Sequence, residues 1–174
     1  LYSNSTTALY SYFSGAKRRA GFPYKGRKYA YNIFGPAERD KYHNAELQLK
    51  LVENLGIPIK EKYFPIQISE EDKNYSDSIL SKYSGNDFIG ISLTGGWNSK
   101  KCPPERYAEI IKELEKKYSF IPLILWGPGD EKDADKIVSH LPKAVKIPNC
   151  TFMQMGAIME NCKFILCNDS GPMH

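Results

Sequence analysis

Phe88-Ile89-Gly90-Ile91-Ser92-Leu93 is the first of four short apolar stretches that decide the fold of this chain. The others cover residues 123–126, 144–147 and 164–167. Near-continuous apolar runs are typical of strands that helices cover on both faces. Helical patterns separate the four runs, and strands that alternate with helices form parallel sheets with right-handed crossovers. We therefore predict an α/β fold, a Rossmann-like parallel sheet with helices on both faces.

The segments between these strands carry helix signals. Thr151 and Gln154 form a capping box that starts a helix to about residue 161. After the turn at residues 127–129, Asp130 is the predicted N-cap of a helix to about His140. Pro103-Pro104 opens the remaining helix, whose apolar side chains recur at helical spacing: Tyr107, Ile110, Ile111, Leu114 and Tyr118.

The first half of the chain also has helical patterns, over residues 3–13, 46–55 and 69–83. Ser84-Gly85-Asn86-Asp87 then forms a turn-rich stretch. We predict a domain boundary there. Residues 1–85 are expected to be the remainder of an N-terminal domain with its linker, and residues 86–174 the first part of a C-terminal domain, so that both domains are incomplete.

Composition limits the class of protein. The chain has 174 residues, of which 41% are hydrophobic and 25% are charged, as is typical of globular proteins. Its net charge of +4 is too small to indicate nucleic-acid binding by itself. No apolar run approaches the roughly 20 residues of a membrane span. The four cysteines form no C-x-x-C pair, so we expect reduced thiols in the cytoplasm and no metal site.

The last seven residues, Asn168-Asp169-Ser170-Gly171-Pro172-Met173-His174, follow a predicted buried strand. Gly171-Pro172 turns the chain, and proline suits the first turn of a helix. Free backbone N–H groups and the helix dipole then point at one spot, which favours an anion. The side chains of Asp169, Ser170 and His174 add groups that bind hydroxyls or phosphate. The sequence therefore predicts an anion site here.

Two other loops also follow strands, at residues 94–101 and 127–131. In an open parallel sheet, ligands bind at the carboxyl ends of the strands, so all three loops are expected to converge on one ligand. Thr94 and Gly95 begin the first loop, and glycine lets backbone approach an anion closely. Lys100 or Lys101 supplies a cation, and Glu131 an acceptor suited to ribose hydroxyls. Asp169 is expected to fix its own loop. Together they describe a site for a nucleotide diphosphate.

Several other site classes are excluded or disfavoured. The chain has no P-loop signature, and no G-x-G-x-x-G followed by an acid about 20 residues on, so a P-loop kinase and a nicotinamide dehydrogenase are disfavoured. No paired-carboxylate loop offers a divalent metal site. Residues 17–31 mix basic and aromatic side chains, which leaves three interpretations open: nucleic-acid binding, a solvated face, or contact with an anionic surface such as the inner membrane leaflet. We do not expect nucleic acid as a partner.

Four segments resemble glycosyltransferase family 9, the lipopolysaccharide heptosyltransferases. Residues 168–174 resemble the family's D-[ST]-G-x-M-H motif. Lys100-Lys101-Cys102-Pro103 with Tyr107-Ala108 resembles its K-x-W-P-x-x-x-[FY]-A segment, and Trp126-Gly127-Pro128 with Glu131 its [WG]-G-x-x-x-E/D turn. Residues 14–22 are similar to a family stretch late in the N-terminal domain.

The resemblance implies a two-domain GT-B fold and transfer of heptose, with inversion and without a metal or cofactor, from an ADP-sugar to the lipopolysaccharide inner core. It implies that Lys100, Ser170, Gly171 and His174 bind the donor diphosphate and that Glu131 holds the ribose. It also implies a cytoplasmic location, with peripheral contact at the cytoplasmic face of the inner membrane.

Two departures from the family pattern affect these expectations. Cys102 stands where the family usually has Trp, and the smaller side chain is expected to loosen that loop. The family's glycine-rich N-terminal segment, which carries the acid expected as general base, has no counterpart here, so we assign no catalytic residue. Two alternatives stay open: another GT-B enzyme that uses a UDP-sugar, as a transferase or epimerase, and a non-catalytic protein that binds a sugar nucleotide.

Overall fold

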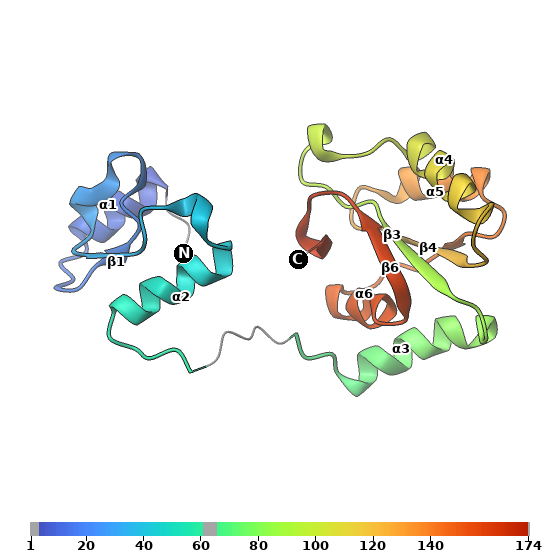
Figure 1. Ribbon diagram of the computed structural model, residues 1–174, viewed down its shortest axis with the longest axis horizontal. Coiled ribbons are helices and arrows are strands. Elements are labelled where there is room, and N and C mark those ends of the chain that lie inside the picture. The colour runs from blue at the N-terminus through green and yellow to red at the C-terminus, as the bar shows by residue number, and fades with distance from the viewer. Residues whose placement is uncertain (1–3, 61–65, 174) are drawn as a thin grey trace. The chain divides into compact units, whose positions relative to one another are not determined.

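The computed structural model describes residues 4–60 and 66–173, which divide into two compact units, Leu1–Pro65 and Ile66–His174 (Figure 1). The second unit therefore begins before the boundary predicted at Gly85. The reason is that α3 (Glu70–Leu80) packs against α6 (Phe152–Met159). Ser76 is buried on α3, and its hydroxyl donates to the carbonyl of Ala157 at 3.3 Å.

The C-terminal unit is built on a sheet of four strands. They are β3 (Phe88–Ser92), β4 (Ile121–Leu125), β5 (Val145–Lys146) and β6 (Cys162–Cys167). All neighbours pair in parallel, in the order β5-β4-β3-β6. The predicted parallel α/β unit is confirmed.

Alternation along β4 separates the two faces of this sheet. Ile124 points into the core on the side of α4 (Pro104–Glu115) and α5 (Glu131–His140), whereas Leu123 and Leu125 pack on the side of α3 and α6. Figure 1 shows the two helix pairs on opposite sides of the strands. Helices on both faces explain why the β4 run is almost wholly apolar.

The predicted helix starts are confirmed at two positions and wrong in one detail. Ser69 with Asp72 and Thr151 with Gln154 form capping boxes that begin α3 and α6. Asp130 occupies the N-cap position of α5, but its side chain makes no capping hydrogen bond, because it is engaged elsewhere. In α4, Ile111 is fully buried, whereas Ile110 is 36% exposed and Tyr118 lies beyond the helix end.

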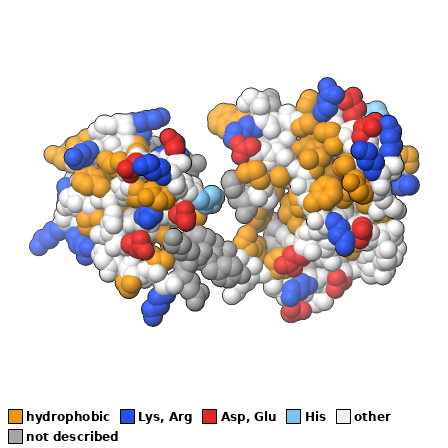
Figure 2. All heavy atoms as spheres, in the orientation of Figure 1, with side chains coloured by type: hydrophobic (Ala, Val, Ile, Leu, Met, Phe, Trp, Pro, Cys, Tyr) orange, Lys and Arg blue, Asp and Glu red, His pale blue; other side chains and the backbone are white. Residues whose placement is uncertain are grey.

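Strand β6 is less buried than its apolar sequence indicates. Within the described part of the chain it pairs only with β3, at the edge of the sheet. Phe164 is 47% exposed for this reason. Figure 2 shows hydrophobic side chains gathered over the part of the C-terminal unit where Figure 1 places β6.

The N-terminal unit contains α1 (Ser5–Phe13), α2 (Asn44–Asn54) and a short parallel pair, β1 (Ala20–Gly21) with β2 (Ile33–Phe34). These helices agree with the patterns predicted around residues 3–13 and 46–55. Its buried side chains form two small clusters rather than one core: Ala8, Ala30 and Tyr31; Phe22, Leu47 and Leu51. Short 3-10 turns complete both units: Tyr24–Ala30, Arg39–Lys41, Ser81–Tyr83, Asn98–Lys100 and Gly171–Met173.

Ile124→Ala tests whether β4 carries the core of the C-terminal unit. Ile124 is fully buried, and removing its branched side chain leaves a cavity beneath α4 and α5. We expect a loss of about 2–5 kcal/mol in the free energy of unfolding, measured by denaturant titration. Ile110→Ala, on the partly exposed side of α4, is the matched control and should cost less than half as much. Equal losses would contradict the layered core.

Candidate functional site

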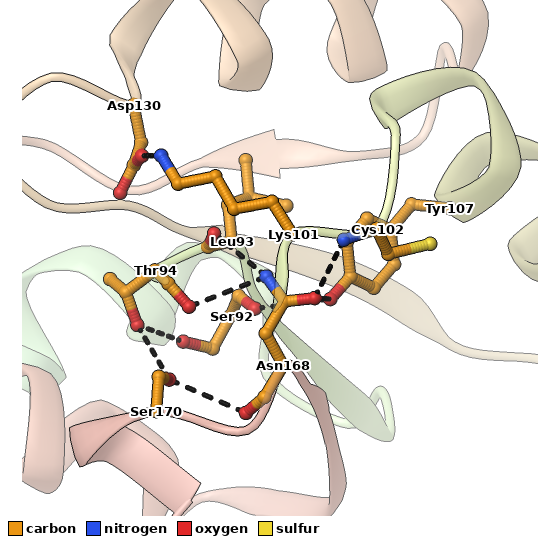
Figure 3. A network of polar contacts seen from close by, with 9 residues as sticks. All are labelled: Ser92, Leu93, Thr94, Lys101, Cys102, Tyr107, Asp130, Asn168 and Ser170. Carbon is orange, nitrogen blue, oxygen red and sulfur yellow. Dashed lines mark hydrogen bonds and ion pairs between the residues drawn. The ribbon is translucent and has the colours of Figure 1, made fainter. Parts of the chain in front are cut away.

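The carboxamide of Asn168 joins three segments at the carboxyl end of the sheet (Figure 3). Its Oδ1 accepts from the backbone N–H of Cys102 at 2.9 Å and from the hydroxyl of Tyr107 at 2.8 Å. Its Nδ2 donates to the carbonyls of Leu93 at 2.9 Å and Thr94 at 3.3 Å. Only 6% of Asn168 is exposed. One buried amide therefore ties the end of β6 to the end of β3 and to the start of α4.

Tyr107, on α4, holds the carboxamide of Asn168 through its hydroxyl. Its ring is buried against the sheet, and its hydroxyl also donates to the carbonyl of Ser92 at 3.4 Å. Burial raises the pKa of Tyr107 to about 12, because the phenolate would lose its hydration. The hydroxyl therefore stays a donor to Asn168 throughout the neutral range.

A pair of hydroxyls links the first loop to the third. Thr94 Oγ1 lies 3.1 Å from Ser170 Oγ and 3.3 Å from Ser92 Oγ. Ser170 Oγ also reaches the carbonyl of Asn168 at 3.4 Å. The loop holding Ser170 then continues into the 3-10 turn Gly171–Met173.

These three loops line one open pocket of about 280 Å³. Each loop follows a different strand, β3, β4 or β6, so the pocket lies where the sequence predicted convergence. Its lining is mostly glycine, hydroxyl and proline, with one lysine and one aspartate. The lining residues are Thr94, Gly95, Gly96, Lys101, Gly127, Pro128, Asp130, Ser170, Gly171 and Pro172.

Two lysine–aspartate pairs cross between these loops. The Lys101 ammonium binds the carboxylate of Asp130, and both side chains line the pocket. The Lys100 ammonium binds the carboxylate of Asp169, with both side chains about half exposed, at 47% and 60%. Lys100 does not line the pocket. Asp169 therefore links its loop to the first loop through Lys100.

Glu131 lies outside the pocket lining, one residue after Asp130. Its carboxylate accepts from the Lys146 ammonium at 3.3 Å, and Asp135 accepts from the same ammonium at 2.6 Å. These bonds, that of Asp135 first, raise the pKa of Lys146. The same ammonium lies 5.1 Å from the centre of the Trp126 ring. Glu131 is thus held at the start of α5 beside an aromatic face.

The structure brings together most of the predicted site residues. Thr94, Gly95, Ser170 and Gly171 line the pocket, while Lys100, Glu131 and Asp169 lie in the same loops but not in its lining. His174 lies outside the described residues. Sequence reasoning did not select Asn168, although its place directly after a buried strand was visible. It assigned Asp130 a capping role because Asp before a helix usually has one.

In the part of the chain that the structure describes, no group of three or more His, Cys, Asp or Glu is placed to hold a metal ion. No helix in those residues is long and apolar enough to cross a bilayer. The four cysteines are free thiols of intermediate burial.

Asn168→Ala tests the junction directly. The substitution removes four hydrogen bonds and leaves the carbonyl of Leu93 and the N–H of Cys102 without this partner. We expect a loss of about 2–4 kcal/mol in the free energy of unfolding by denaturant titration. Asn86→Ala is the matched control, since Asn86 is exposed and its Nδ2 donates to the carbonyl of Tyr83 at 2.9 Å. A loss at Asn168 no larger than at Asn86 would refute its role as the junction.

Several solved structures share the fold of this chain. E. coli ADP-heptose lps heptosyltransferase II is similar with a TM-score of 0.66 and 20% identity, over 97% of this chain and 55% of that chain. A glycosyl transferase family 9 structure from Veillonella parvula DSM 2008 has a TM-score of 0.70 and 20% identity, over 100% of this chain and 51% of that chain. The structure of E. coli heptosyltransferase WaaC with ADP has a TM-score of 0.55 and 14% identity, over 83% of this chain and 44% of that chain.

The chain thus spans about half the length of the solved proteins it matches, which share its α/β fold of the GT-B type. The search of curated proteins finds no match. The model for glycosyltransferase family 9 (heptosyltransferase) matches residues 4–174. Since that match covers almost the whole sequence, the chain belongs to glycosyltransferase family 9.

Proposed function

We propose that this protein is a glycosyltransferase of lipopolysaccharide biosynthesis that transfers heptose, or a similar sugar, from an ADP-sugar to an inner-core acceptor. The pocket at the carboxyl ends of β3, β4 and β6 is the observation that carries the proposal. The family match supports it. Two of the similar solved structures are described as heptosyltransferase WaaC with ADP and with ADP-2-deoxy-2-fluoro heptose, which supports an ADP-sugar as the donor.

The pocket suits the diphosphate of such a donor. Gly95, Gly96 and Gly127 leave its walls without side chains, so an anion can approach the backbone closely. Thr94 and Ser170 add hydroxyl donors, and Lys101 adds a cation. In the proposed complex Lys100 reaches the diphosphate from the rim, and Glu131 accepts from the ribose hydroxyls.

The proposed reaction is attack by an acceptor hydroxyl on the anomeric carbon, with ADP leaving from the opposite face and inversion at that carbon. Negative charge grows on the leaving diphosphate during this step. Preorganised amides, hydroxyls and ammonium groups stabilise that charge in the transition state. The acceptor hydroxyl also needs a general base, and we assign none of the described residues to that role.

The proposed acceptor is anionic and lies at a membrane. The first part of the chain suits such a partner, since residues 1–37 contain six Lys and Arg side chains and no Asp or Glu: Lys17, Arg18, Arg19, Lys25, Arg27 and Lys28. We propose peripheral contact with the cytoplasmic face of the inner membrane through charge of this kind. The protein should bind vesicles of anionic lipid and should not bind vesicles of neutral lipid. Equal binding to both, or to neither, would contradict this contact.

Lys100→Ala tests the diphosphate site. Losing one charge-assisted hydrogen bond should weaken ADP binding by about 1.5–3 kcal/mol, measured by isothermal titration calorimetry on the intact protein. Lys112→Ala, on the exposed side of α4, is the matched control and should bind ADP normally. Unchanged affinity in Lys100→Ala would refute the role of Lys100. Binding of UDP in preference to ADP by the unaltered protein would favour the UDP-sugar alternative instead.

We propose that transfer needs no divalent metal, because lysines, hydroxyls and loop amides are available to meet the charge of the diphosphate. Activity of the intact protein, measured as ADP released from ADP-heptose, should therefore be unchanged after EDTA treatment. Recovery by magnesium or manganese of an activity that EDTA had abolished would contradict the proposal.

A further inference from the structure

The ion pair between Lys101 and Asp130 is the feature of the pocket that the family motifs leave unused. In the motif segment Lys101 occupies the variable position after Lys100, and Asp130 precedes the motif acid. Yet Lys101 and Asp130 are the two charged side chains among the pocket's lining residues. The Asp130 side chain is only 6% exposed and that of Lys101 is 27% exposed. A charge this deeply buried needs a partner of opposite sign.

Asp130 takes this partner in place of a capping bond. It occupies the N-cap position of α5, with φ −99° and ψ 1°, and its side chain makes no bond to the first turn of that helix. Its main chain still starts the helix, because its carbonyl accepts from Asp133 at 3.1 Å and from Ala134 at 3.0 Å. The backbone N–H groups of a first helical turn are good hydrogen-bond donors to a carboxylate. A second arrangement for the Asp130 side chain is therefore close by.

Two glycines lie beside the ion pair: Gly95 against the stem of Lys101, and Gly127 against Thr94 and Asp130. A Cβ built on Gly95 would lie 2.8 Å from Cγ of Lys101, so the stem of Lys101 crosses the backbone of the first loop where only glycine leaves room. A Cβ on Gly127 would lie 3.2 Å from Cγ2 of Thr94 and 3.7 Å from Oδ2 of Asp130. Gly95 thus leaves room for the Lys101 stem, and the ammonium of Lys101, in the first loop, binds the carboxylate of Asp130 in the second.

We propose that Lys101 is a second phosphate-binding cation of the donor site and that Asp130 is its counter-ion until the diphosphate replaces it. This inference rests on the proposed function. An incoming diphosphate is attracted by the ammonium and repelled by the carboxylate, so the two side chains have opposite effects on its affinity. When the diphosphate takes the ammonium, Asp130 turns to the first-turn amides of α5.

The test measures binding of ADP, AMP and adenosine to the intact protein by calorimetry. Lys101→Gln should weaken ADP binding by more than about tenfold, AMP by less, and adenosine not at all, because the lost group acts on phosphate alone. Asp130→Asn should tighten ADP binding by about threefold or more, because it removes the competing charge. Lys117→Gln, at an exposed position beyond α4, is the matched control.

A purely structural ion pair gives a different result. Lys101→Gln and Asp130→Asn would then both lower the thermal stability, and both would weaken the binding of ADP and of adenosine equally. That outcome would overturn the inference. Gly95→Ala provides a second variant that keeps both charges but obstructs the lysine stem, and it should weaken ADP in the same way as Lys101→Gln. If the unaltered protein binds no nucleotide, the proposed function fails as well. If it binds ADP and Lys101→Gln binds ADP as tightly, only the role of Lys101 fails.

Discussion

The buried carboxamide of Asn168 is the contact on which the site depends. An amide is the side chain that suits this place, because it accepts from the N–H of Cys102 while it donates to the carbonyl of Leu93. A carboxylate would repel the carbonyl, and an apolar side chain would leave both backbone groups unpaired at a cost of about 1–3 kcal/mol each. Parallel strands bring their carboxyl ends to one edge, and Asn168 turns that proximity into a fixed arrangement of loops.

Charge adds a second constraint on the same loops. Lys101 with Asp130 and Lys100 with Asp169 connect the first loop to the second and third, respectively. The exposed pair at Lys100 contributes little to stability, because water and salt screen it. The buried pair at Lys101 is costly to break from one side alone. The amide of Asn168 therefore holds the loops, together with the pair at Lys101 until a diphosphate takes its ammonium, and Lys100 keeps the freedom to move toward a ligand.

Sequence patterns sufficed for the local features of the fold and failed where distant contacts decide. The parallel strands and the capping box of Thr151 follow from short-range signals, and the structure confirms them. The domain boundary at Gly85 was placed by a turn signal, but the burial of Ser76 against α6 joins α3 to the second unit. Asp130 was assigned to its own helix because its true partner, Lys101, lies in another loop.

The pocket itself was predictable as a place but not in its details. Convergence of the three loops follows from parallel strands alone, whereas the choice between Lys100 and Lys101 depends on which stem crosses Gly95. No spacing rule contains that information. The family resemblance implies that Glu131 holds the ribose. In the structure its carboxylate accepts a hydrogen bond from Lys146 on β5, a contact that no sequence motif indicates.

Cys102 shows how the site tolerates a departure from its family's pattern. A smaller side chain in place of the usual Trp was expected to loosen the first loop. In the structure the backbone N–H of Cys102 donates to Oδ1 of Asn168 at 2.9 Å, so this anchor of the loop does not involve the thiol. The thiol packs against the core beneath α4, where burial raises its pKa and keeps it a neutral filler. The group that anchors the loop is thus the backbone N–H of Cys102, and its side chain is a separate part of the packing.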